Sequence, residues 1–312
     1  MASGNAKITV IGAGNVGATC AFVLAQKKLG EIVLLDIFEG FAKGKALDMS
    51  QGGQILNYDG KITGTSDYAD IAGSDVVVVT SGFPRQPGMS REDLIGKNAD
   101  IITEVGSGIK EYAPDSVIVM VTNPLDLMTY HMQKVTGFPY HRVVGQAGIL
   151  DSARMTHFIA QEIGCSNEDV QAMVLGGHGD TMVPLPRYTT VGGIPITQLL
   201  DQDTIDAISK RTAGGGGEIV KLLERGSAFY APGSAAAIMA ESVVKDRKRL
   251  LPCSAHLSGQ YGLDDIYIGV PVILGKNGIE KIIELELEDS ERESLQGSAM
   301  FYKEQLNNLL GY

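Results

Sequence analysis

The amino-acid sequence predicts an α/β protein whose first half forms a doubly wound parallel sheet and whose second half is a separate α+β domain. Two observations support this prediction. Short, continuously apolar, β-branched runs alternate with helix-length segments through the first half, and a glycine-rich turn joins the first run to the first helix. Parallel strands that helices cover on both faces have this apolar pattern. The alternation stops near residue 148, so we expect one domain over 1–147 and another over 148–312.

Strands of the first half are expected where β-branched residues cluster in runs too short for a stable helix. The clearest run holds four consecutive valines, Val76–Val79. The predicted strands cover 7–11, 31–36, 75–80, 116–122 and 142–145, and helical spacing of apolar residues predicts a helix over 16–27. In such a sheet, ligands are expected at the carboxyl ends of the strands.

The second half combines longer helices with fewer strands. Helical patterns cover 150–163, 203–224, 232–248 and 289–310, and strand patterns cover 170–175, 267–274 and 282–287. The glycines at 214–217 weaken the second of these helices, whereas Pro232 suits the first turn of the third. No internal repeat or low-complexity linker separates the halves, so we expect them to pack tightly.

Composition limits the classes of partner. The chain of 312 residues has a net charge of −11, which argues against a nucleic-acid partner and against docking on an anionic membrane. Its three cysteines, Cys20, Cys165 and Cys253, lack metal-ligand spacing and are odd in number, so we expect reduced thiols, no metal site and a cytoplasmic location. The uncharged stretch 8–26 contains several glycines, and only Lys7 precedes it closely, which disfavours a signal peptide or membrane span.

The glycine-rich turn has the sequence GAGNVG at 12–17, between the first predicted strand and helix. Glycines at these positions allow a tight turn and the close approach of a pyrophosphate to the amino end of the helix. Asp36 follows Gly17 by nineteen positions and ends the second predicted strand, where a carboxylate binds ribose hydroxyls and repels a 2′-phosphate. These features predict a Rossmann-type domain that binds NAD rather than NADP; a glycine-rich turn without a nucleotide is the alternative.

A candidate acid–base group lies near the start of the second half. Asp151 and Arg154 are three positions apart, so on a helix they share one face. His178 stands between glycines after an apolar run. A histidine that an aspartate orients can exchange a proton near neutral pH, and an arginine can bind a carboxylate through two hydrogen bonds. Of the five histidines, His178 alone has a carboxylate candidate in this interpretation, which favours oxidation of an anionic alcohol.

Two further polar features follow predicted strands. The loop 81–91 contains glycines and prolines that suit a hinged lid, with Arg85 and Arg91 able to reach a site when it closes. The alternative is that both arginines are solvated at the surface. Asn123 follows the strand at 116–122 and could bind substrate or the nicotinamide ribose; the alternative is a helix cap.

Six motifs in a fixed order identify a family resemblance. They are GAGNVG, Asp36, SGFPRQPGMSRED, VTNPLD, GILDSAR and GGHGD, and together they span nearly the whole chain. The chain resembles the lactate/malate dehydrogenase family, in the branch that acts on malate but is close to the lactate enzymes in sequence. The resemblance implies an NAD-dependent oxidoreductase with a Rossmann domain, a catalytic α+β domain, a homodimer or homotetramer, and a role in the tricarboxylic acid cycle.

The resemblance also implies residue roles. His178 would accept the hydroxyl proton in alcohol oxidation and return it in the reverse direction, while Asp151 fixes its tautomer. Arg154 would hold the substrate carboxylate, Arg91 would polarise the carbonyl, and Asn123 would assist orientation. The residues implied to line the NAD site are Gly12, Gly14, Asn15, Val16, Gly17, Asp36, Asn98, Val121 and Asn123.

Arg85 decides the expected substrate. Lactate-specific members of the family typically carry glutamine at the matching lid position, whereas an arginine there suits the second carboxylate of malate and oxaloacetate. Gln86 leaves the register of the lid open, because a shifted loop would present glutamine instead. Ala228 stands where the lactate enzymes have threonine, which leaves room for a dicarboxylate.

Three alternatives to malate oxidation stay open. The first is a lactate dehydrogenase, which in practice only Arg85 distinguishes from a malate enzyme. An NAD-dependent glycosidase would need a divalent metal and a Cys/His site, and no cysteine here lies beside a histidine at ligand spacing. A non-catalytic NAD-binding protein would not need the set formed by Asp151, Arg154 and His178.

Overall fold

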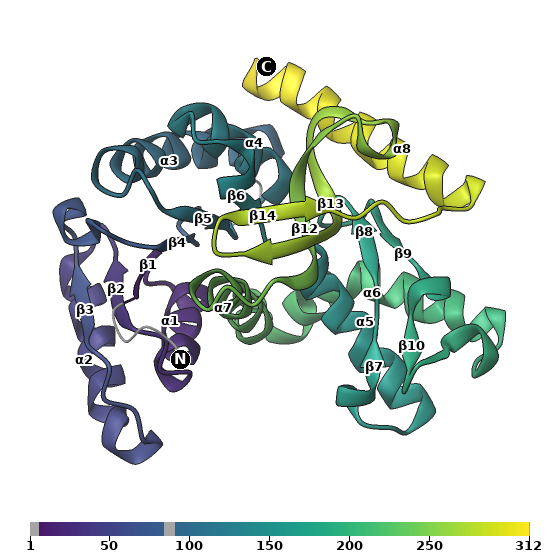
Figure 1. Cartoon of the computed structure of the whole chain (residues 1–312), viewed down its shortest axis with the longest axis horizontal. Coiled ribbons are helices and arrows are strands. Elements are labelled where there is room, and N and C mark those ends of the chain that lie inside the picture. Colours follow the sequence, from purple (N-terminus) through teal and green to yellow (C-terminus); the bar gives the residue numbers. More distant parts are fainter. Residues whose placement is uncertain (1–5, 84–90, 312) are drawn as a thin grey trace.

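The computed structural model describes residues 6–83 and 91–311, and its first half alternates strands and helices as the sequence predicts. The six strands of this half are parallel and lie in the order β3-β2-β1-β4-β5-β6, which is the strand order of dinucleotide-binding sheets (Figure 1). The elements are β1 (Lys7–Ile11), α1 (Asn15–Gln26), β2 (Glu31–Leu35), α2 (Glu39–Leu56), β3 (Ile62–Thr65), β4 (Val76–Val79), α3 (Arg91–Tyr112), β5 (Val117–Met120), α4 (Leu125–Thr136) and β6 (Val143–Gly145).

The second half adds antiparallel strands to the same sheet. Strand β12 pairs with β6 and β13, and β13 pairs with β8, so one sheet runs through both halves. The elements are α5 (Gly148–Ile163), β7 (Val170–Gln171), β8 (Val174–Gly176), β9 (Met182–Pro184), β10 (Thr190–Val191), β11 (Ile194–Pro195), α6 (Gln202–Leu223), α7 (Tyr230–Val244), β12 (Arg249–Ser258), β13 (Asp264–Gly275), β14 (Gly278–Ile282) and α8 (Asp289–Gln305). The predicted fold class, a parallel Rossmann sheet followed by an α+β unit, is confirmed.

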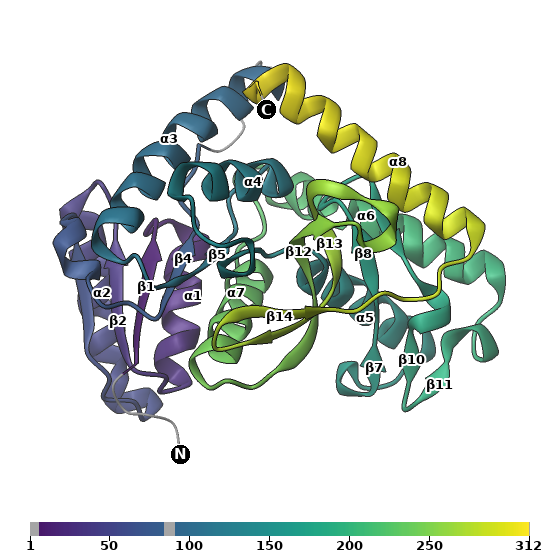
Figure 2. The same ribbon diagram turned by 45° about the horizontal axis from the view of Figure 1, so that its top comes forward.

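Helices cover both faces of the parallel sheet. Figures 1 and 2 show α1 and α7 on one side and α3 and α4 on the other. Helix α7 comes from the second half yet packs against α1, where a Cβ on Gly233 would lie 2.7 Å from Thr19. The four valines of β4 are 0% exposed, and each such buried side chain contributes roughly 1.5–3 kcal/mol to folding.

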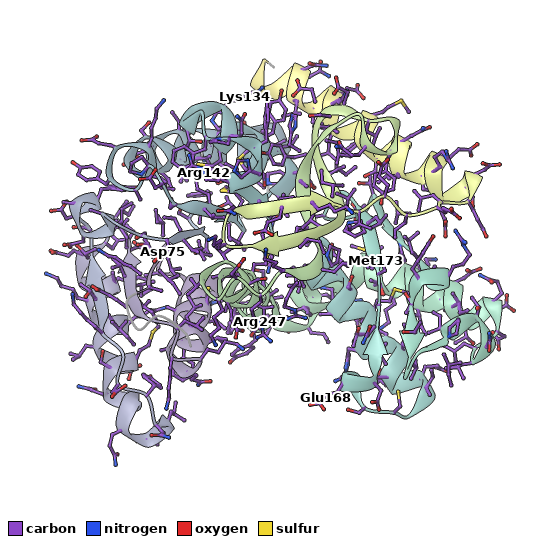
Figure 3. All side chains as sticks on the ribbon, in the orientation of Figure 1. Asp75, Lys134, Arg142, Glu168, Met173 and Arg247 are labelled. Atoms are coloured by element: carbon purple, nitrogen blue, oxygen red, sulfur yellow. The ribbon has the colours of Figure 1, made fainter. Side chains whose placement is uncertain are left out.

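Polar side chains cover the outside of this core. Figure 3 labels Asp75 within the first half, near β4, and Glu168 at the lower end of the second half, near β7. Both residues are exposed. No helix among the described residues is both long and apolar enough to cross a membrane.

Several predicted strands differ from the structure. The run 170–175 is interrupted, because β7 joins a small sheet with β10 while β8 joins the large sheet. The strand expected over 282–287 shares only Ile282 with β14, which forms a hairpin with β13 earlier in the chain. Strand β12 was not predicted, although it is the neighbour that joins β6 to β13.

The helices differ mainly at their ends. Helix α7 ends at Val244 rather than at 248, because Asp246 and Lys248 adopt positive φ angles that end the helix. The closing helix α8 ends at Gln305 and continues as a π-helical turn over Leu306–Leu310. The glycines at 214–217 leave α6 continuous.

Candidate active site

The glycine-rich turn brings the amino end of α1 against the sheet. Gly12 has a φ of +101°, and a Cβ there would lie 2.7 Å from the Ser81 nitrogen. A Cβ on Gly17 would collide with the carbonyl oxygen of Gly12. Gly14 faces open space and provides no side-chain cap to α1, so the N–H groups of the first turn remain available to an anion.

Asp36 follows β2 and is fixed by two backbone N–H groups. The N–H of Ala13 donates to Oδ2 at 2.7 Å, and that of Phe38 donates to Oδ1 at 3.0 Å. The carboxylate therefore stands beside the glycine-rich turn, where the sequence places the ribose contact. The turn and Asp36 fit the dinucleotide that the fold implies.

A large cavity opens where the two halves meet. Its volume is about 1180 Å³, and it extends from α1 to the loop before α7. The predicted site residues on its wall are Val16, Asn98, Val121, Asn123, Arg154 and His178, and Ala228 also lines it. The other predicted residues of the NAD site, Gly12, Gly14, Asn15, Gly17 and Asp36, lie outside this wall, on the turn that contains Val16 and at the end of β2.

His178, Asp151 and Arg154 form one connected group. His178 Nδ1 lies 2.9 Å from Asp151 Oδ2, and Arg154 Nη1 donates to Asp151 Oδ1 at 3.0 Å. Asp151 is 2% exposed, whereas the His178 and Arg154 side chains keep 13% and 14% exposure where they reach the cavity. The helical spacing of three positions in α5 accounts for the shared carboxylate.

Burial and charge act in opposite directions on His178. Burial disfavours the charged imidazolium, but the negative charge of Asp151 and its hydrogen bond outweigh this effect, and the pKa of His178 is raised above its usual 6.5. The neighbouring guanidinium of Arg154 opposes the rise. Since Nδ1 is engaged by Asp151, Nε2 is the nitrogen through which this ring can exchange a proton with a ligand.

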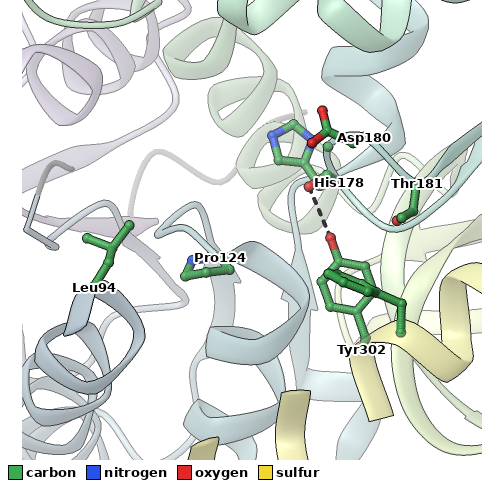
Figure 4. Close-up of a pocket in the computed structure, with 8 residues that line it drawn as sticks. Leu94, Pro124, His178, Asp180, Thr181 and Tyr302 are labelled. Carbon is green, nitrogen blue, oxygen red and sulfur yellow. Dashed lines mark hydrogen bonds between the residues drawn. The ribbon is translucent and has the colours of Figure 1, made fainter. Parts of the chain in front are cut away.

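Two groups that were missed in the sequence hold the main chain of His178. Asp126 at the start of α4 accepts the His178 N–H at 2.9 Å, and the Tyr302 hydroxyl of α8 donates to the His178 carbonyl at 3.3 Å (Figure 4). Tyr302 also lines a smaller cavity of about 360 Å³ beside His178. A carboxylate in the first turn of the helix that follows β5 was the available signal for Asp126, whereas nothing in the sequence links α8 to this loop.

The asparagines have different surroundings. Asn98 is buried and accepts the Phe83 N–H at 2.6 Å, while its amide nitrogen donates to the Asn123 carbonyl at 2.7 Å. It therefore ties α3 to the ends of β4 and β5. The side chain of Asn123 is not a helix cap, because the N-cap of α4 is Pro124 and no side chain caps it. Arg85 and the side chain of Arg91, the first residue of α3, lie outside the described residues.

His178 is not alone in having a carboxylate partner. His256 Nε2 lies 3.0 Å from Asp265 Oδ1, across the β12–β13 hairpin, and Tyr140 stacks on the imidazole at 3.6 Å between ring centres. The prediction that only His178 has a carboxylate candidate is therefore wrong. The pairing of two antiparallel strands made this second contact, and β12 was not predicted.

The Rossmann sheet carries a glycine turn and an acidic strand end, and the cavity beside it holds an oriented histidine and an arginine. Together these features define an NAD-dependent oxidoreductase. Comparisons with known proteins give the particular family. The family model described as the NAD binding domain of lactate/malate dehydrogenase matches residues 6–145, and that of the alpha/beta C-terminal domain matches 149–310. The chain belongs to the lactate/malate dehydrogenase family.

Individual relatives agree with this assignment. The chain is 57% identical to malate dehydrogenase of Methanosarcina mazei over 97% of this chain and 99% of that protein. It resembles the solved apo malate dehydrogenase of Picrophilus torridus, with a TM-score of 0.93 and 50% identity over 96% and 95% of the two chains. The lactate dehydrogenase of Cryptosporidium parvum, solved with lactic acid and β-nicotinamide adenine dinucleotide, has a TM-score of 0.93 and 43% identity over 97% and 98%.

Proposed function

We propose that this chain is an NAD-dependent malate dehydrogenase that interconverts malate and oxaloacetate. The observation that supports this most directly is the connected group His178–Asp151–Arg154, whose histidine and arginine line the large cavity. The similarity to the malate dehydrogenase of Methanosarcina mazei selects malate among the hydroxy acids that such a site could hold.

His178 is the general base in alcohol oxidation. Its Nε2 takes the hydroxyl proton as the C–O bond gains double-bond character, and the ring returns that proton when the carbonyl is reduced. Asp151 holds the ring with Nδ1 protonated and stabilises the imidazolium. When bound, NAD supplies the acceptor for the hydride that leaves the carbon atom. The residues proposed to hold it are Gly12, Gly14, Asn15, Val16, Gly17, Asp36, Asn98, Val121 and Asn123.

The arginines recognise and activate the substrate in this proposal. Arg154 binds the carboxylate next to the reacting carbon through paired hydrogen bonds. Arg91 polarises the carbonyl as negative charge develops on its oxygen. Arg85 binds the distal carboxylate that distinguishes malate from lactate. Ala228 supports this role, because a small side chain on the cavity wall leaves room for the longer acid.

The experiment measures NADH oxidation with oxaloacetate and with pyruvate, in the wild type and in Arg85→Gln. We expect the wild type to prefer oxaloacetate and the variant to lose most of that preference. In the variant the distal carboxylate of oxaloacetate has no cationic partner, and an unpaired buried charge costs several kcal/mol. Arg249→Gln, at an exposed position on β12, is the matched control and should keep the preference. Preference of the wild type for pyruvate would identify a lactate enzyme; no turnover with either acid would exclude both.

We further propose a homodimer or homotetramer in which α2 contributes to the interface. Its outer face exposes Phe41 at 48%, Leu47 at 60% and Ile55 at 78%. Exposed apolar groups concentrated on one element mark interaction surfaces. Sedimentation should show dissociation of Leu47→Glu, whereas Met300→Glu, which adds the same charge at an exposed site on α8, should leave the assembly intact.

We also propose that residues 1–147 and 148–312 form two domains and that the protein is cytoplasmic. The change from parallel to antiparallel pairing between β6 and β12 supports the division, and hydrogen exchange should resolve two cooperative units. Burial raises the pKa of Cys20 to about 12, so this thiol stays protonated and reacts poorly in disulfide exchange, in keeping with the reduced thiols of a cytoplasmic protein. Fractionation of cells that produce the protein tests the location.

A further inference from the structure

Asp126 is a buried carboxylate that joins three separate parts of the fold. It belongs to the first turn of α4 and is 1% exposed. Its Oδ2 accepts the backbone N–H of His178 at 2.9 Å, and its Oδ1 accepts the Ser254 hydroxyl of β12 at 2.6 Å. One side chain therefore connects helix α4, the antiparallel hairpin and the loop that carries the catalytic histidine.

This arrangement is unfavourable for the carboxylate itself. Burial raises the pKa of Asp126 to about 6, although the hydrogen bonds from Ser254 and His178 lower it. The charged groups that face it are His178, which favours its ionisation, and Asp151, which opposes it. A neutral side chain of the same shape would avoid the cost of burying this charge, so the structure alone does not require an acid at this position.

The other side of the histidine loop is also fixed. The carbonyl of His178 accepts the Tyr302 hydroxyl, and the N–H of Gly177 donates to Ser298 at 2.9 Å. With Asp126 on the His178 N–H, the backbone on both sides of the ring is fixed. The direction of the imidazole toward Asp151 and the cavity then depends on these anchors.

We propose that Asp126 is a positioning residue for the catalytic histidine: it fixes the His178 main chain, and its negative charge helps to stabilise the imidazolium form. This inference rests on the proposed function, because it concerns the same proton transfer. It assigns to α4 a part in catalysis beyond its place in the fold.

Asp126→Asn separates charge from shape. The amide oxygen can still accept the His178 N–H, and the amide nitrogen can donate to the Ser254 oxygen, so both contacts persist while the charge is lost. We expect kcat for oxaloacetate reduction to fall several-fold with a smaller change in KM. We expect the high-pH decline of the rate to move to lower pH. The melting temperature at pH 8 should not fall, because the variant no longer buries an ionised group.

Asp126→Ala removes the anchor as well as the charge. Because a displacement of about 1 Å at a catalytic group can cost on the order of 100-fold, we expect a larger loss of kcat than in the asparagine variant. Ser254→Ala removes the second hydrogen bond alone and should also reduce kcat. Its control is Ser242→Ala, which loses a similarly buried hydrogen bond of 2.7 Å to the Leu274 carbonyl, far from His178, and should keep kcat.

The outcomes separate this inference from the proposed function. With an active wild type, an Asp126→Asn variant of unchanged kcat and pH profile would overturn the role of the Asp126 charge, and an Asp126→Ala variant of unchanged kcat would overturn its positioning role; both results leave the proposed function standing. The positioning role is also overturned if activity in Asp126→Ala falls only in proportion to thermal stability, because a merely structural residue behaves in that way. A wild type without turnover on oxaloacetate would remove the proposed function and this inference with it.

Discussion

At the scale of single residues, Asp151 is the centre of the active site. It accepts from both His178 and Arg154, so one buried carboxylate fixes the proton-transfer group and the carboxylate-binding group together. The proposed chemistry needs this coupling, because the two groups must meet the hydroxyl and the carboxylate of one substrate molecule at once. A change at Asp151 should therefore affect binding and proton transfer together.

The raised pKa of His178 sets the pH dependence of the reaction. Reduction of oxaloacetate requires protonated His178, so its rate should be highest below the raised pKa and decline as the pH rises through it. In Asp151→Asn the raising charge is lost, and the decline should begin at lower pH. We also expect kcat to fall by roughly 10⁴-fold, the size seen when an aspartate that orients a catalytic histidine is replaced by its amide.

The measurement is the pH profile of oxaloacetate reduction under conditions in which hydride transfer limits turnover. A deuterated NADH tests that condition through its isotope effect. A wild-type rate that stays flat across the histidine titration range would contradict the assignment of His178. An Asp151→Asn profile at the wild-type position would contradict the role of Asp151.

At the scale of elements, the glycines of α6 explain how Arg154 fits. The guanidinium lies across this helix: a Cβ on Gly215 would meet Arg154 Cδ at 3.2 Å, and one on Gly216 would meet Nη2 at 3.5 Å. Glycine inside a helix costs roughly 0.5–1 kcal/mol relative to alanine. The glycines therefore lower the helical stability of α6 along the stretch that Arg154 contacts.

We therefore expect two neighbouring substitutions to differ in their effect on KM. Gly215→Ala should displace Arg154 by a few tenths of an ångström and raise KM for oxaloacetate several-fold. Gly214→Ala, whose Cβ would have nothing within 4 Å, should leave KM unchanged and stabilise the protein by about 0.5–1 kcal/mol. Steady-state kinetics and urea unfolding test both. Equal KM values in the two variants would show that the glycine run does not serve Arg154.

At the scale of the whole molecule, Glu241 connects α7 to the first half of the chain. Its side chain is 4% exposed and lies 2.8 Å from Lys27, 2.9 Å from Arg247 and 3.2 Å from Lys245. Burial opposes ionisation of Glu241, but the cations outweigh it and lower its pKa to about 2.

This network should contribute to stability in a defined pH range. Because the pKa of Glu241 is depressed, its contribution is present above pH 4.5 and is lost as the pH falls toward 2. Glu241→Gln should lower the free energy of unfolding at pH 7 by roughly 1–2 kcal/mol, less than for a fully buried pair because the cations are partly exposed. Near pH 2 the difference should vanish.

The control is Glu39→Gln on α2. It breaks a 2.7 Å pair with Lys43 in which both side chains are more than half exposed, and such pairs contribute little. Urea unfolding at both pH values gives the comparison. Equal effects of the two substitutions at pH 7 would show that burial of Glu241 does not strengthen its ion pairs.

The sequence by itself determined the parallel half of the fold and the central chemical groups. The valine run of β4, the glycine turn before α1 and the three-position spacing of Asp151 and Arg154 are local patterns. Their structure follows from neighbours along the chain, through steric limits, strand burial and the helical repeat. The family resemblance rested on the same local motifs.

Only the tertiary structure decided which distant segments complete the site. Asp126, Ser254 and Tyr302 come from three elements and meet around His178, and β12 brings His256 to Asp265. These contacts depend on strand pairing and helix packing between residues far apart in the chain. Local apolar periodicity shows that a segment is buried but does not specify its partner. That choice is made when the whole core packs, since burial is non-directional and only the assembled fold satisfies all buried polar groups together.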